Sequence, residues 1–145
     1  MQAYPHHYAV RAVAETAGSV LIHSERLPTL TTAVPSQFGG PGDQWSPETL
    51  LVAAVADCFV LTFRVIATTS KLTWSHLDCD ADGVLDRADG VLRFTELHLR
   101  ARLVLPTTED ADRARQFLEK AEAKCLVSNS LVARPTLTTE IVTEP

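Results

Sequence analysis

The stretch SPETLLVAAVADCFVLTFRVIA, residues 46–67, decides how this chain folds. Serine is a favoured N-cap, proline fits the first helical position, and a glutamate follows in the first turn. The segment then stays apolar for about five turns, so we expect a helix from Ser46 to about Thr69. Because a single sheet covers only one side of such a helix, we also expect a second subunit on the other side.

The same stretch is close to the minimum length of a membrane span. Asp57 and Arg64 would then lie inside the bilayer, at a cost of several kcal/mol together. The capping signals at Ser46 indicate instead that the helix begins inside a folded domain. We therefore expect a long buried helix of a soluble protein and no membrane partner.

Composition narrows the class of protein further. With 145 residues, 46% hydrophobic and 21% charged, the chain predicts one domain over residues 1–145 and excludes the disordered and collagen-like classes. The net charge of −5 and the lack of a basic cluster argue against a nucleic-acid partner. The N-terminus has no signal-peptide pattern, and three sparse cysteines do not form a disulfide framework. We therefore expect a cytoplasmic location.

The rest of the chain predicts short strands and one further helix. Polar and apolar residues alternate strictly in two segments after the long helix, as in strands with one solvated face. This order of elements is typical of an α+β fold. The expected elements are strands at 7–14, 19–25 and 28–34, a loop at 35–45, a hairpin over 75–105 that turns at Ala88-Asp89-Gly90, a helix at 107–124, a turn at 125–131 and a last strand at 135–144.

Two cysteines are candidates for redox chemistry. Cys58 lies in the long helix beside Asp57, a carboxylate that plain packing does not need and that Arg64 could pair with. Cys125 lies where the second helix ends and a new turn begins, and amide groups there would favour a thiolate. Cys79 lies on the apolar face of a strand, and we interpret it as a packing residue.

SPETLLVAAVADCF, followed by CLVSNSL 67 residues after its cysteine, resembles the osmotically inducible protein C and organic hydroperoxide resistance (OsmC/Ohr) family. The match rests on the Pro–Glu pair at 47–48, the cysteine ten residues after that glutamate, and a late Cys-x-x-Ser. The resemblance implies an OsmC-like α+β fold with N-terminal antiparallel strands, a long buried central helix, a hairpin, a second helix and a last strand. It also implies an intertwined homodimer with active sites at the interface.

For function, the resemblance implies thiol-dependent reduction of hydroperoxides, preferably organic ones. Cys58 would be the peroxidatic thiol, Cys125 the resolving thiol and Glu48 the residue that orients active-site hydrogen bonds. Because Glu48 lies about 15 Å along the helix from Cys58, only a partner helix could bring it to that thiol. We expect no cofactor besides an external dithiol or lipoyl-type reductant. The residues predicted to line an apolar substrate pocket are Phe38, Leu51, Phe59 and Phe63.

The chain departs from the family pattern in two places. The N-terminal turn AETAGSV lacks the arginine that stabilises the thiolate in the hydroperoxide-resistance branch, and Leu126 stands where a proline often follows the late cysteine. Arg26 is a better substitute for the missing arginine than Arg11, because its loop precedes the glycine-rich segment. An alternative therefore stays open, in which the chain is an OsmC-like binding module that has lost peroxidase activity.

Two metal sites compete with these interpretations. Residues 78–89, DCDADGVLDRAD, match the ligand spacing of an EF-hand loop, but their flanks do not read as helices. A zinc site could use the three cysteines and a histidine, although no C-x-x-C or H-x-x-x-H spacing occurs. We expect a strand at 78–89 and no metal.

Overall fold

The computed structural model describes all of residues 1–145. The chain divides into two compact units, Met1–Leu50 and Leu51–Pro145. The single domain expected over residues 1–145 stays a prediction, because compactness by itself does not show whether a unit folds independently.

The first unit holds a three-stranded antiparallel sheet in the order β1-β2-β3. Its strands, β1 (Arg11–Ala14), β2 (Val20–His23) and β3 (Leu30–Thr32), are shorter than the sequence predicts. The central strand explains this difference, because β2 offers only four residues for pairing with its neighbours. The loop that follows includes a short helix, η1 (Ser36–Phe38), which ends at Gly39 with a positive φ of 86°.

The long helix α1 (Pro47–Thr69) begins where its sequence signals predict. The backbone N–H of Ser46 donates to Thr49 Oγ1 at 2.9 Å, and the N–H of Thr49 donates to Ser46 Oγ at 3.2 Å. This reciprocal pair is a capping box that uses threonine at the third helical position. The predicted helix is thus confirmed at both of its ends.

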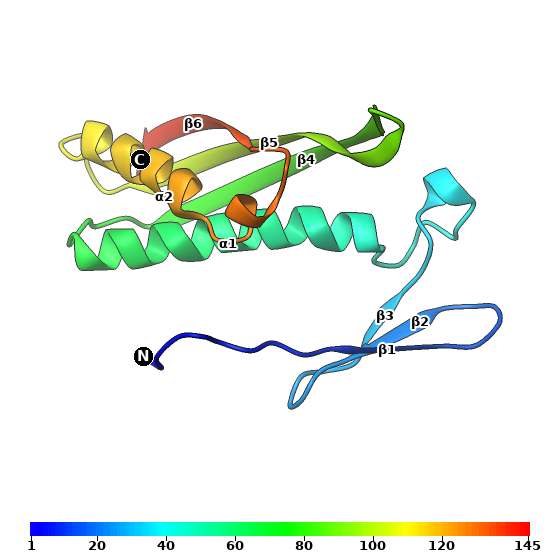
Figure 1. The fold of residues 1–145 in the computed structure, drawn as a ribbon. Helices are drawn as coiled ribbons and strands as arrows, with labels where there is room; N and C mark the ends of the chain where they lie inside the picture. Colours follow the sequence, from blue (N-terminus) through cyan, green and yellow to red (C-terminus); the bar gives the residue numbers. More distant parts are fainter. The chain divides into compact units, whose positions relative to one another are not determined.

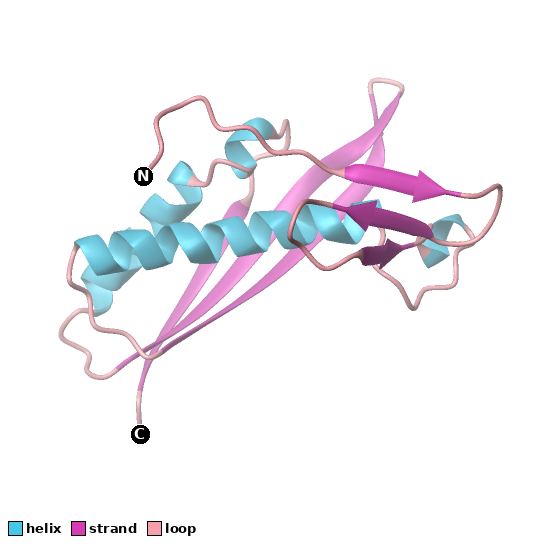
Figure 2. Cartoon of the chain, turned by 90° about the horizontal axis from the view of Figure 1, so that it is seen from below, coloured by secondary structure: helices cyan, strands magenta, loops and turns pink.

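The second unit is built on a sheet in the order β4-β5-β6, as Figure 1 shows. Strands β4 (His76–Ala88) and β5 (Val91–Leu105) are antiparallel, and β6 (Thr136–Thr143) runs parallel to β5. The hairpin turns at Asp89 and Gly90, both with positive φ, as the sequence predicts. Figure 2 shows α1 running across these strands.

Both helices pack on the same face of this sheet. After β5, the helix α2 (Ala111–Lys124) and the short helix η2 (Ser128–Ser130) lead to the last strand. The inward residues of β5 alternate along the strand and share one core with buried residues of α1 and α2. The α+β class is confirmed. The buried residues of this core include Val55, Phe59, Phe63, Leu97, Leu99, Leu103, Leu105, Ala114, Leu118 and Ala121.

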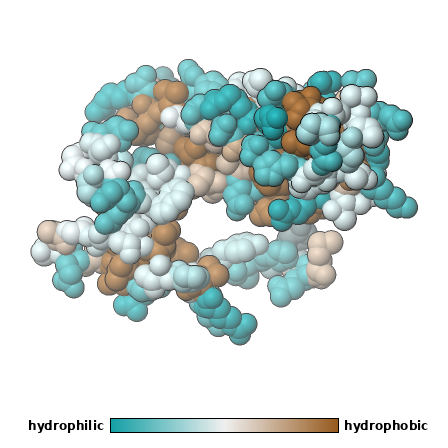
Figure 3. All heavy atoms as spheres, turned by 180° about the vertical axis from the view of Figure 1, so that it is seen from behind, coloured by the Kyte–Doolittle hydropathy of each residue, from teal (hydrophilic) through white to brown (hydrophobic).

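In one chain, α1 is covered on one side alone, as the sequence predicts, and the second subunit expected on its other side stays a prediction. Only one face of α1 packs in the core, and Leu61 and Val65 are 46% and 66% exposed. A single sheet cannot cover both faces of one helix. Figure 3 shows hydrophobic side chains scattered over a largely hydrophilic surface on one face of the chain.

By length and apolar composition alone, α1 could cross a membrane. Core helices of soluble proteins often have the same composition, and one face of α1 packs against the sheet described above. The expected absence of a membrane partner stays a prediction.

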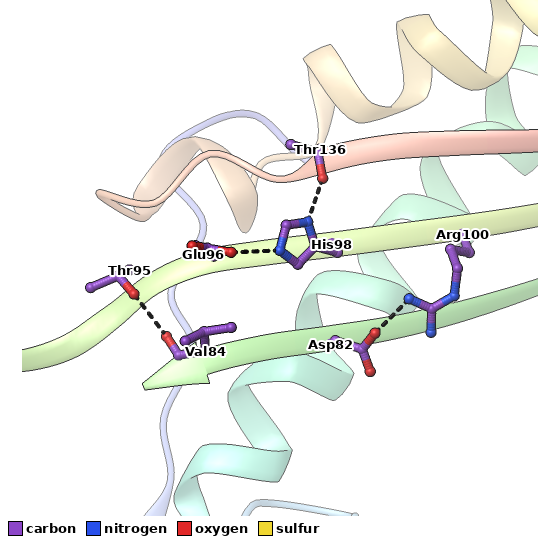
Figure 4. A network of polar contacts seen from close by, with 7 residues as sticks. All are labelled: Asp82, Val84, Thr95, Glu96, His98, Arg100 and Thr136. Atoms are coloured by element: carbon purple, nitrogen blue, oxygen red, sulfur yellow. Dashed lines mark hydrogen bonds and ion pairs between the residues drawn. The ribbon is translucent and has the colours of Figure 1, made fainter. Parts of the chain in front are cut away.

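The solvated face of the second sheet carries a row of polar contacts, drawn in Figure 4. Arg100 Nη1 lies 2.5 Å from Asp82 Oδ2 and holds the pKa of that carboxyl below its ordinary value. His98 contacts Glu96 at 2.9 Å and Thr136 at 2.7 Å. Most of residues 78–89 thus belong to strand β4, which confirms the strand over an EF-hand loop, and the absence of a metal stays a prediction.

Candidate functional site

Cys58 lies near the middle of α1 and is half-buried. Thr62 follows one turn later on the same side of the helix, and its Oγ1 lies 4.0 Å from Cys58 Sγ. Either atom can donate in this contact, and the hydroxyl acts to lower the pKa of Cys58. The helix therefore presents one thiol together with one hydroxyl.

Cys125 lies at the end of α2 and is completely buried. Its N–H donates to the Glu122 carbonyl at 3.2 Å, which closes the last turn of α2. Its own carbonyl accepts a hydrogen bond from the Asn129 N–H at 3.0 Å, which opens the turn that contains η2. The chain therefore changes direction at this cysteine, as the sequence predicts.

The structure brings these two thiols together. Burial is the largest cause that raises the pKa of Cys58, and interaction with the Cys125 thiol is the next. The backbone amide of Val127 acts in the opposite direction and lowers the pKa of Cys58, as does Thr62. Both cysteines are free thiols. Two adjacent free thiols of unequal accessibility are an arrangement that can form a reversible disulfide.

Within one chain, the net effect is to raise the pKa of the Cys58 thiol above its ordinary value, with burial as the largest cause. None of the groups that act on Cys58 is a cation. The amide donors expected near Cys125 are present, but the Val127 amide acts on Cys58. A nucleophilic thiolate at this site therefore needs a further positive group.

The carboxylate beside Cys58 is not part of this arrangement. Asp57 is exposed, Arg64 is also exposed, and the two side chains form no ion pair. The expectation that Asp57 marks a special core position is wrong, because adjacent helical residues point in directions about 100° apart.

Glu48 and Arg26 belong to the first unit. Glu48 is half-buried, and its Oε2 is a buried atom without any hydrogen-bond donor. Arg26 lies in the turn between β2 and β3 with a positive φ of 63°, and its side chain is 89% exposed. Its partner in an ion pair is Glu25, at 3.7 Å. The catalytic roles expected of Glu48 and Arg26 stay predictions.

The four residues expected to line a substrate pocket have different environments. Phe59 and Phe63 are completely buried in the core, where Phe63 meets Trp74 edge-on, so their expected contact with substrate is corrected to a packing role. Leu51 is half-buried on α1. Phe38 is 54% exposed and lines a pocket of about 320 Å³ in the first unit. For Leu51 and Phe38 the role stays a prediction.

Cys79 is a packing residue, as the sequence predicts. It is half-buried against the core, and burial followed by the charge of Asp80 raises its pKa to about 11. At neutral pH it is therefore a neutral thiol.

This raised pKa predicts a pH effect on stability. A group whose pKa is higher in the folded state stabilises the fold below its unfolded pKa, and that contribution is lost as pH rises. The free energy of unfolding should therefore fall between pH 9 and about 11, by about 1 kcal/mol after allowance for partial exposure. Urea unfolding at several pH values measures this loss, and Cys79→Ala should reduce it. Equal pH slopes for the two proteins would contradict the assignment.

A comparison with known proteins settles the family of this chain. The sequence pattern of the family described as OsmC-like protein matches residues 40–140, which is well over half of the chain. The chain belongs to the OsmC-like family. The matched range includes both adjacent thiols and Glu48, but leaves out the first three strands and Arg26.

Individual relatives agree with this OsmC-like assignment. Peroxiredoxin OsmC of Escherichia coli is 33% identical over 92 residues, which span 63% of this chain and 64% of that protein. An OsmC-like protein of unknown function from Vibrio cholerae has a TM-score of 0.81 at 18% identity, with 97% and 99% of the two chains covered. An organic hydroperoxide resistance protein from Legionella pneumophila has a TM-score of 0.74 at 22% identity, with 98% and 100% covered. At these identities, the two structures establish the OsmC-like fold alone.

Sequence reasoning missed two groups of this OsmC-like site, Thr62 and the Val127 amide. Thr62 could have been found, because it lies four residues after Cys58 on a predicted helix. The Val127 amide carries no side-chain signal, so only the folded backbone reveals it. Ser128 is completely buried, and its hydroxyl has no hydrogen-bond partner. The sequence contains it only as part of the late Cys-x-x-Ser motif.

Proposed function

We propose that this OsmC-like protein reduces hydroperoxides, preferably organic ones, through Cys58 and Cys125. The observation that carries the proposal is the adjacency of two free thiols, one half-buried and one completely buried. The name of the E. coli relative, a peroxiredoxin, and that of the L. pneumophila neighbour, an organic hydroperoxide resistance protein, support the same chemistry.

The reaction proceeds in three steps. The Cys58 thiolate attacks the distal oxygen of the peroxide, the O–O bond breaks, and the alcohol leaves with a proton while Cys58 becomes a sulfenic acid. The Cys125 thiol then displaces the sulfenic hydroxyl as water, which forms the Cys58–Cys125 disulfide. An external dithiol supplies two electrons and two protons, and both cysteines return to thiols.

The first step requires a cation, and we assign it to a second subunit. In one chain, the amide of Val127 and the hydroxyl of Thr62 do not offset the burial that raises the pKa of Cys58. An arginine close to the sulfur would lower that pKa, and Arg26 is our candidate. The buried, unpaired oxygen of Glu48 supports this proposal, because a guanidinium would give it the missing donor.

The exposed apolar face of α1 is the proposed dimer contact. Leu61→Asp should therefore dissociate the dimer, because an unpaired charge would be buried in the interface. We expect its dissociation constant to rise at least about a hundredfold, measured by analytical ultracentrifugation. Val132→Asp makes the same chemical change at an exposed loop position and should stay dimeric. A wild-type monomer, or an unchanged Leu61→Asp dimer, would contradict this contact.

A thiol count tests the proposed function. Reduced protein is mixed with one equivalent of cumene hydroperoxide, and free thiols are titrated under denaturing conditions. The wild type should lose two of its three thiols, with peptide mapping placing the disulfide between Cys58 and Cys125, while Cys79 stays free. The Cys58→Ser variant should lose none. A disulfide that involves Cys79, or equal losses in the two proteins, would overturn the mechanism.

A second function competes with this one. The lack of a cation acting on Cys58 favours an OsmC-like binding module without peroxidase activity. In that case the wild type would lose thiols no faster than a free thiol does in solution. The rate of loss in the same titration therefore decides between the two functions.

The proposed function also includes a cellular location, an oligomeric state and a source of electrons. We propose a cytoplasmic homodimer that uses no metal or bound cofactor and takes its electrons from a dithiol or lipoyl-type reductant. A reducing compartment suits a chain whose three cysteines form no structural disulfide.

A further inference from the structure

The turn after α2 gives Cys125 the geometry of an N-cap. The cysteine has an extended backbone, with φ −62° and ψ 110°, and its carbonyl accepts the N–H of Asn129. Ser128 is therefore the third residue of the turn. A side chain at this position of a capped turn points back toward the N-cap residue, and here both residues are completely buried.

The Ser128 hydroxyl is a buried polar group without a hydrogen-bond partner. The group it would reach in a capping box is the N–H of Cys125, but that N–H already donates to Glu122. A buried hydroxyl without a partner destabilises a fold, so its presence at this position needs a reason. Ser130, two residues later, differs because its exposed hydroxyl donates to the Leu126 carbonyl at 2.9 Å.

Accessibility decides how the two sulfurs take part in reduction of their disulfide. Cys125 is completely buried, whereas Cys58 has some exposed surface. An incoming thiolate therefore attacks Cys58, and the sulfur that leaves is Cys125. The negative charge then appears at a buried atom, where a hydrogen-bond donor has a large effect.

We propose that the Ser128 hydroxyl donates a hydrogen bond to the Cys125 sulfur when that sulfur is an anion. This inference rests on the redox pairing of Cys58 and Cys125 in the proposed function. The thiolate of an external dithiol bonds to Cys58, the S–S bond breaks, and its electron pair stays on Cys125, which Ser128 stabilises. The second thiol of the reductant then displaces Cys58, and the protons of the reductant end on the two cysteines.

The test compares Ser128→Ala with the wild type after oxidation by diamide, which needs no peroxidase activity. Dithiothreitol should reduce the disulfide of Ser128→Ala about tenfold more slowly, because the leaving thiolate lacks its donor. The equilibrium constant against a dithiothreitol redox buffer should stay within about twofold of the wild-type value, because both cysteines end protonated and the donor acts only on the transient anion. The melting temperature should stay the same or rise, because an unpaired buried hydroxyl is removed.

Ser130→Ala is the matched control, and its reduction rate and potential should equal those of the wild type. An unchanged reduction rate in Ser128→Ala would overturn the inference, as would a slower reduction together with a lower melting temperature. Failure of diamide to form the Cys58–Cys125 disulfide would overturn it as well. A slower reduction of Ser128→Ala in a protein that consumes no hydroperoxide would support this inference and overturn only the proposed function.

Discussion

Replacing Cys58 with serine is expected to lower kcat/KM for cumene hydroperoxide by on the order of a thousandfold or more. A serine hydroxyl does not ionise at neutral pH and cannot replace a thiolate as the nucleophile. Peroxide consumption with dithiothreitol as reductant measures the effect. The variant should keep its melting temperature within a few degrees, because the exchange of sulfur for oxygen at a half-buried position changes the packing little.

The other two cysteines supply the controls. Cys125→Ser should still reduce the first equivalent of peroxide, but its Cys58 sulfenic acid has no neighbouring thiol and should oxidise further to the sulfinic acid, which mass spectrometry detects. Cys79→Ser should keep the wild-type rate, because its thiol belongs to the sheet. Wild-type turnover in Cys58→Ser would exclude this residue as the peroxidatic thiol.

Phe63→Ala should have the largest effect on stability among the substitutions considered. Phe63 is completely buried, and its ring meets that of Trp74 edge-on at 5.5 Å between centroids. Truncation leaves a cavity between α1 and the sheet, and such changes cost about 3–5 kcal/mol. Urea unfolding, followed by tryptophan fluorescence, measures the loss.

Arg64→Ala is the control for this measurement. Arg64 is the next residue on the same helix, but it is exposed and forms no ion pair. We expect a change within about 0.5 kcal/mol. Similar losses for the two variants would contradict the assignment of faces to α1.

Most of the secondary structure was predictable because its signals are local. Ser46 and Thr49 cap the long helix, and alternation along β5 separates the core residues from the solvated ones. Asp89 and Gly90 form the hairpin turn where the sequence predicts it. The strands of the first unit were predicted too long, because the length of a strand depends on its partner as well as on its own residues.

The candidate site was predictable in part. The resemblance that led to the family rested on Cys58 and Cys125 in their motifs, and the structure places the two thiols side by side. Asp57 was misleading, because one step along a helix separates a half-buried thiol from an exposed carboxylate. Phe59 and Phe63 were misleading for a related reason, since an apolar helix does not reveal which face packs in its own core.

By itself, then, the sequence determined where the helices and the longer strands lie, which family the chain belongs to, and which cysteines to examine. Only the tertiary structure decided that Cys125 is sealed from solvent while Cys58 is not, that the Val127 amide acts on the pKa of Cys58, and that the Ser128 hydroxyl has no partner. The physical reason is distance along the chain. Capping and alternation act between close neighbours in sequence, whereas the two thiols meet only because both helices pack on one face of the same sheet.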